Sequence, residues 1–128
     1  MDIGNNIKKD LGVRDGKLTE LAKKPNCVSS QASNASKQVN PLKYSVDLKV
    51  QMDKVVNAIS DMPGVEIKQK SDNYVYAVFT TKIMRFKDDV EVYLDDESKT
   101  LHFRSASRVG YSDLGVNRKR YEAFVSKL

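Results

Sequence analysis

The fold is decided by residues 65–103, VEIKQKSDNYVYAVFTTKIMRFKDDVEVYLDDESKTLHF, in which apolar and polar residues alternate in four short segments. A period of two is typical of strands that bury one face against a core. Polar turns separate the segments, and short turns of this kind join antiparallel neighbours. The predicted strands begin at Val65, Tyr74, Val90 and Leu101. The sequence therefore predicts a four-stranded antiparallel meander.

The second of these segments, residues 74–84, differs from the others because it is apolar on both faces. It lies between two predicted turns, Ser71–Asn73 and Lys87–Asp89. One face is formed by Val75, Ala77, Phe79 and Ile83, and the other by Tyr74, Tyr76 and Val78. Both faces of the sheet therefore need to be covered.

One helix is predicted before the meander in the sequence and another after it. Between residues 47 and 62 apolar residues recur at helical spacing, and Pro63 and Gly64 end the pattern. The last helix begins between Asp113 and Asn117, either of which can cap it. Its apolar face is formed by Leu114, Tyr121, Phe124, Val125 and Leu128.

The order of these elements predicts an α+β fold in a single domain. Its core is expected to span residues 41–128, with two helices on one face of a sheet of four strands, or five if residues 42–44 add a short one. Residues 1–40 are polar and lack such patterns, so we expect an extended N-terminal arm that packs on the domain and covers the far face of the sheet.

Composition narrows the class of protein. The 128 residues carry a net charge of +5 and contain one cysteine, Cys27, and one histidine, His102. This excludes an intramolecular disulfide and a zinc site of repeated cysteines. No stretch approaches the ~20 apolar residues of a membrane-spanning helix. If Met1 is the natural start we expect a cytoplasmic protein, whereas an exported or plastid-like location stays open if the chain is a trimmed mature form.

The segment RSASRVGYSDLGVNRKR, residues 104–120, is rich in arginine and holds four of the six arginines of the chain. Strand alternation places Arg104 and Arg108 on the outward face, opposite Asp89 and Glu91 of the neighbouring strand. Guanidinium groups in this arrangement either bind an anion or form a cross-strand ladder of charge pairs. Both interpretations stay open on the sequence.

The helical part of the motif conflicts with local electrostatics. Arg118, Lys119 and Arg120 lie in the first turns of the last helix, where the peptide dipoles already make the helix end positive. Buried acceptors, Asp88 or Asp89, or a bound anion must compensate. The candidate anion site therefore comprises Arg104, Ser105, Ser107, Arg108, Asp113, Asn117, Arg118 and Arg120, with Asp88, Asp89 and Glu91 as candidate acidic partners.

Four blocks of the chain carry a family resemblance: GVRDGKL (12–18), PNCVSSQ (25–31), FKDDVEVYLD (86–95) and the arginine-rich motif. In order and spacing they resemble the bacterial and plastid domain-of-unknown-function family 1499. The resemblance implies one small domain without an established activity or cofactor. Similar members often carry a second cysteine shortly before PNCVSS, where this chain has Leu21, which argues against a disulfide or paired-thiol role for Cys27.

Three other kinds of site have weaker support in the sequence. Cys27 and His102 could act as nucleophile and base, but no catalytic motif surrounds them, and free cysteines are more often small buried apolar residues. The acidic cluster 88–97 matches no calcium loop, so no metal is expected. An aromatic and basic sheet face could stack nucleobases, but no RNA-reading motif is present and the arm is expected to cover that face, which argues against nucleic acid.

Two functional hypotheses follow. The first is a non-catalytic binding or structural module, in which the arginine-rich strand, turn and helix contact an anionic small molecule or a protein partner, without a cofactor. The alternative is a small hydrolase or transferase acting on an anionic small molecule, with Asp88 or Asp89 as the base. The enzyme requires that carboxylates and guanidinium groups converge on an open pocket.

Overall fold

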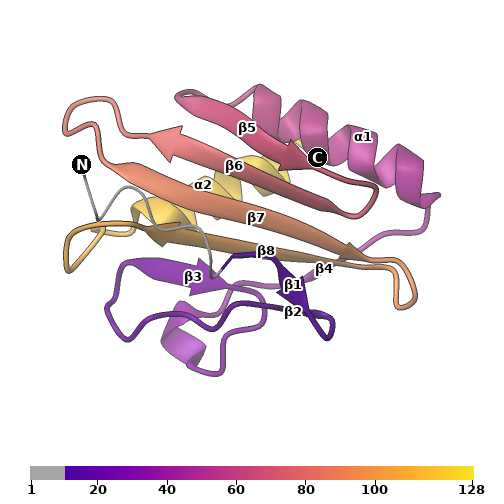
Figure 1. Cartoon of the computed structure of the whole chain (residues 1–128), viewed down its shortest axis with the longest axis horizontal. Coiled ribbons are helices and arrows are strands. Elements are labelled where there is room, and N and C mark those ends of the chain that lie inside the picture. The colour runs from indigo at the N-terminus through magenta and orange to yellow at the C-terminus, as the bar shows by residue number, and fades with distance from the viewer. Residues whose placement is uncertain (1–10) are drawn as a thin grey trace.

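Two helices pack on one face of an antiparallel sheet in the computed structural model, which describes residues 11–128 (Figure 1). The helices are α1 (Leu48–Ser60) and α2 (Val116–Ser126). The main sheet comprises β3 (Cys27–Ser29), β4 (Leu42–Lys43), β5 (Val65–Lys70), β6 (Tyr74–Thr80), β7 (Lys87–Asp95) and β8 (Thr100–Ser107). A separate hairpin, β1 (Val13–Arg14) and β2 (Lys17–Leu18), and the 3-10 turn η1 (Ala35–Lys37) complete the elements. The α+β prediction is confirmed.

The sheet has six strands, which is more than the four or five that the sequence predicted. Its order is β3-β8-β7-β6-β5, and β4 also pairs with β8. The meander β5 to β8 and the short strand β4 were predicted. The additional strand β3 was missed because three residues are too few to show an alternation, and it forms by pairing with the free edge of β8.

The core lies between the sheet and the helices. The inward faces of β6, β7 and β8 bury Phe79, Val92 and Phe103 against Ile59 of α1 and Phe124 of α2. The chain leaves α1 through Gly64, whose φ is +75° and where an added Cβ would lie 2.5 Å from the carbonyl oxygen of Thr80. Only glycine fits this close approach, so the turn brings β5 directly alongside β6.

A second, smaller cluster covers the opposite face. Tyr74, Tyr76 and Val78 of β6 pack against Leu18 of β2, with Leu11, Val13 and Tyr93 around them. Thus part of the segment 11–31 covers the second apolar face of β6, as its two-sided pattern required. The division of the chain into an arm and a core at residue 40 stays a prediction.

Three local predictions were wrong. Lys87–Asp89 is the beginning of β7 rather than a turn, so Asp88 and Asp89 point to opposite faces of the sheet. The turn is instead formed by residues 81–86, and Ile83 is 87% exposed there because β6 ends at Thr80. Leu114 is also 87% exposed, because α2 begins only at Val116.

Two loops lie at the same end of the sheet. The 81–86 loop joins β6 to β7, and the 108–115 loop joins β8 to α2 (Figure 1, left). We call this region the loop end. Within residues 11–128, neither helix has the length and apolar character that crossing a membrane requires.

Candidate functional site

Arg120 of α2 reaches the sheet and pairs with Asp88 of β7. Its Nη2 lies 2.8 Å from Oδ2 of Asp88, and the two side chains are 9% and 1% exposed. Among residues 11–128 neither carboxylate oxygen of Asp88 has a hydrogen-bond partner, so the contact with Arg120 is an ion pair. The Arg120 guanidinium also lies 4.8 Å from the ring centroid of Phe79. A buried carboxylate therefore compensates this cation at the positive helix end, which was one of the predicted solutions.

Asn117 connects the strand, the loop and the helix on this face. Its Oδ1 accepts hydrogen bonds from Nη1 of Arg120, at 2.8 Å, and from the hydroxyl of Ser105. Its Nδ2 lies within 3.0 Å of the carbonyl oxygen of Asn26, the hydroxyl of Ser107 and a carboxylate oxygen of Asp113. The side chain is fully buried, so its loss would remove several interior hydrogen bonds and leave the Ser107 hydroxyl without its donor.

Asp113 fixes the turn into α2. Its carboxylate accepts hydrogen bonds from the backbone N–H groups of Gly115, at 2.8 Å, and Asn117, at 3.0 Å. Burial opposes the charge on Asp113, but these hydrogen bonds and the one from the Asn117 side chain outweigh it and lower its pKa. Gly115 occupies the N-cap position with φ +83°, and Asp113 supplies the capping oxygen in its place.

Arg108 forms the first charge pair on the opposite face of the sheet. Its Nε and Nη2 contact the carboxylate of Asp89 at 2.9–3.1 Å, and Nη2 also donates to the hydroxyl of Tyr76. Tyr76 in turn donates to Asp89 at 2.6 Å. Burial and then the Asp89 carboxylate raise the pKa of Tyr76. All three groups are thus engaged with one another.

Glu91 and Arg104 form the second pair on that face. Nη1 of Arg104 lies 3.6 Å from Oε1 of Glu91, and Oε2 accepts hydrogen bonds from the backbone N–H of Gly12, at 2.7 Å, and from the hydroxyl of Tyr74. Nε of Arg104 donates to the carbonyl oxygen of Thr19 at 2.9 Å. This pair therefore joins the N-terminal segment to the sheet. Together with Arg108–Asp89 it forms the cross-strand ladder that was one of the two predicted interpretations.

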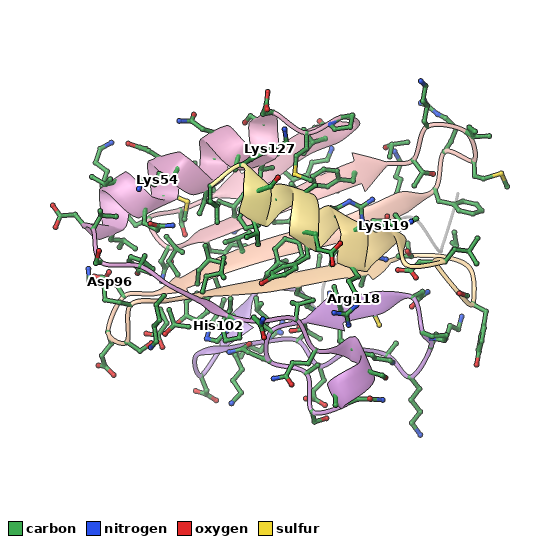
Figure 2. All side chains as sticks on the ribbon, turned by 180° about the vertical axis from the view of Figure 1, so that it is seen from behind. Lys54, Asp96, His102, Arg118, Lys119 and Lys127 are labelled. Atoms are coloured by element: carbon green, nitrogen blue, oxygen red, sulfur yellow. The ribbon has the colours of Figure 1, made fainter. Side chains whose placement is uncertain are left out.

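The predicted site residues consequently divide between two faces. Ser105, Ser107, Asp113, Asn117, Arg120 and Asp88 meet on the helix face, and Arg104, Arg108, Asp89 and Glu91 meet under the N-terminal segment. Arg118 joins neither group, because it points toward the 27–37 segment and donates to the carbonyl oxygen of Ser36 (Figure 2). Binding of an anion by these residues stays a prediction, and each of the three buried arginines already has a carboxylate beside it.

The loop end carries two open grooves that the sequence did not indicate. One, of about 370 Å³, lies between the two loops and is lined by residues of 81–88 and 107–116. The other, of about 620 Å³, lies between the 81–86 loop, the end of α1 and α2. Lys82, Arg85 and Lys119 line this second groove and are exposed, and no ion pair or side-chain hydrogen bond joins them to any residue of 11–128.

Cys27 and His102 each have other partners. The Cys27 thiol is buried and directed at the carbonyl oxygens of Ala22 and Lys24. Nδ1 of His102 lies 3.0 Å from the hydroxyl of Ser30, and burial lowers the pKa of the ring. A nucleophile–base pair is therefore not formed here. Within residues 11–128, no three histidine, cysteine, aspartate or glutamate side chains converge in a way that could hold a metal ion.

Comparison with known proteins supports the resemblance carried by the sequence blocks. A family model described as "Protein of unknown function (DUF1499)" matches residues 17–128, which include every strand of the main sheet and both helices. The chain belongs to the DUF1499 family. No curated protein matches it. The matched residues include the charge pairs on both faces of the sheet, Arg120–Asp88 on one and Arg108–Asp89 and Arg104–Glu91 on the other. The family description assigns no activity to either face.

Proposed function

We propose that this domain is a non-catalytic binding module that recognises an anionic group at the loop end. The cations that would bind the anion are Lys82, Arg85 and Lys119, rather than the buried arginines of the predicted site. The observation that carries the proposal is the contrast in partners: these three cations are exposed around an open groove and unpaired among residues 11–128, whereas Arg108 and Arg120 are paired with aspartates.

Electrostatics favours an anion in this groove. Three cations from two elements converge on it, and the buried pair Arg120–Asp88 lies beside it without net charge. The N-terminal turn of α2 adds the positive end of its dipole. A concave surface lined by one sign of charge concentrates ligands of the opposite sign.

The alternative of a small hydrolase or transferase gains no support from the carboxylates. Asp89 is bound by Arg108 and Tyr76, so it is not placed to accept a proton from a substrate. Asp88 lines the groove between the loops, but its side chain is 1% exposed and paired with Arg120. The arrangement therefore supports binding better than acid–base catalysis.

Titration with inorganic pyrophosphate, followed by NMR and calorimetry, tests the proposal. We expect the wild-type protein to bind it, with the largest amide shifts in residues 81–86 and 116–120. The triple variant K82A/R85A/K119A should lose affinity by roughly tenfold or more, because charge-assisted contacts contribute most of the binding to such a ligand.

The matched control is K24A/K54A/K70A, which removes three other exposed lysines; Lys54, for example, lies on α1 (Figure 2). Its net charge equals that of the test variant, so non-specific attraction falls equally in both. The proposal is wrong if pyrophosphate does not bind, or if the two triple variants bind it with equal affinity.

A further inference from the structure

Exposed apolar side chains gather at the loop end. Of the eight large apolar side chains that are exposed within residues 11–128, six lie in or directly beside the two loops. These are Ile83, Met84, Phe86, Tyr111, Leu114 and Val116. Single exposed apolar residues are ordinary, but a contiguous group marks an interaction surface.

The two loops hold these side chains outward through their own hydrogen bonds. In the first, the backbone N–H of Phe86 donates to the Thr81 hydroxyl, and the N–H of Arg85 donates to the Thr81 carbonyl. In the second, Asp113 and Ser112 accept hydrogen bonds from the N–H groups of Gly115 and Leu114. The projecting conformation is therefore built into each loop.

Leu114 is held outward at a conformational cost. Its φ is +54°, in the left-handed region that a bulky side chain other than glycine rarely adopts, and its side chain is 87% exposed. A glycine or asparagine would fit this backbone with less strain. A leucine that is both strained and 87% exposed gains little from burial within residues 11–128, which points to a partner outside the chain.

Charge complementarity identifies that partner. The unpaired cations Lys82, Arg85 and Lys119 flank the apolar tips Ile83 and Leu114 on the same end of the molecule. Lysine is depleted in the core of protein–protein interfaces. By contrast, a bilayer surface accepts apolar tips at the acyl boundary while long cationic side chains remain among the headgroup phosphates.

We propose that the loop end docks on an anionic lipid bilayer surface, with both loop tips inserted to the headgroup boundary. This inference rests on the proposed function and names the source of the anion as lipid phosphate. The loops insert Ile83, Met84 and Leu114, and Lys82, Arg85 and Lys119 pair with the headgroups. The buried arginines take no part, because their carboxylates already occupy them.

Vesicle sedimentation tests the inference with the full chain. Wild-type protein should sediment with vesicles of equal parts phosphatidylcholine and phosphatidylglycerol, and much less with pure phosphatidylcholine. Because each cation near an anionic surface strengthens binding by about fivefold, K82A/R85A/K119A should weaken it by about a hundredfold. Added salt should weaken wild-type binding as well.

The variant I83S/L114N isolates the apolar contribution. Both positions are exposed and asparagine tolerates the backbone of Leu114, so we expect the variant to remain folded. Vesicle binding should fall by at least about tenfold, as expected from losing two inserted aliphatic side chains, while pyrophosphate affinity stays unchanged. The control is V50S, which removes an exposed valine of α1 outside both loops and should bind as the wild type does.

The outcomes separate this inference from the proposed function. If pyrophosphate binds but vesicles do not, the bilayer inference is wrong and the proposed function stands; a soluble anionic molecule or protein would then be the partner. If neither binds, both are wrong. The inference would also be overturned if I83S/L114N bound vesicles as well as the wild type does. The same holds if V50S lost as much vesicle binding as I83S/L114N.

Discussion

Lys119 and Arg120 are adjacent in the chain, yet they belong to two different regions of the molecule. Arg120 lies in the interior beside Asp88 and Asn117, with its side chain 9% exposed. Lys119 points to the loop end, together with Lys82 and Arg85, and pairs with no carboxylate among residues 11–128. One helical step thus separates a cation that holds the fold together from one that is free to bind. The sequence around the two cations does not distinguish these roles. The presence or absence of a carboxylate beside each side chain does.

The largest effect is expected from R120A. Removing this guanidinium leaves the buried carboxylate of Asp88 uncompensated, which typically destabilises a protein by about 3–5 kcal/mol. Urea unfolding would measure the change. The double variant D88N/R120A should recover part of the loss, because it also removes the buried charge. A loss below about 1 kcal/mol in R120A would contradict the interior role assigned to Arg120.

The next effect is expected from N117A. It leaves the hydroxyl of Ser107 without its donor and removes one of the two donors to the carbonyl oxygen of Asn26, so the free energy of unfolding should fall by about 1–3 kcal/mol. The 108–115 loop should also lose protection in hydrogen exchange. N57A, at an exposed position of α1, serves as the control and should stay within about 0.5 kcal/mol of the wild type. Equal behaviour of the two variants would mean that Asn117 does not anchor the loop.

An intermediate effect that depends on pH is expected from Asp113. Because its pKa is lowered in the folded protein, its contribution to stability is complete above the unfolded value of about 3.9 and is lost as the pH falls through the folded value. D113A should lose about 0.5–2 kcal/mol at neutral pH, the usual range for a lost helix cap, and show a weaker acid dependence below pH ~4. D72A, in an exposed turn, should keep the wild-type dependence.

The smallest effect on stability is expected from K82A/R85A/K119A. Substitutions at exposed positions without partners usually change stability by less than about 0.5 kcal/mol each, so the melting temperature should hardly move. Combined with the loss of pyrophosphate binding described above, this result would sharpen the contrast with R120A. A large destabilisation would instead place these cations with the buried ones.

Much of the fold could be predicted, because long segments carry clear periods. The α1 stripe, the β5–β8 meander and the outward phase of Arg104 relative to Leu101 and Phe103 follow from spacing alone. The beginning of β7 could not be predicted, since Lys87, Asp88 and Asp89 resemble a turn unless the guanidinium groups that neutralise both aspartates are known. Strand β3 depends on the free edge of β8, which is a property of the sheet and not of residues 27–29.

Of the candidate site, only the ion pairs between arginines and carboxylates could be predicted from the sequence. The opposition of Glu91 and Arg104 follows from strand register, and the compensation of Arg120 by Asp88 was one of the stated options. The loop end was missed because TTKIMRF, residues 80–86, continues an apolar strand pattern. The left-handed backbone of Arg85, at φ +59°, turns the chain away from that pattern. Such a turn depends on hydrogen bonds to Thr81 that composition does not indicate.

The pairing of β3 with β8 has a consequence for the order of folding. Cys27 lies opposite Ala106, so a strand synthesised early must wait for the last strand of the sheet before its backbone finds a partner. Contacts across such a separation form slowly, because closing the intervening loop is entropically unfavourable. We therefore expect the meander to assemble first and the N-terminal segment to dock last, so that Tyr74 and Tyr76 stay uncovered until that segment docks.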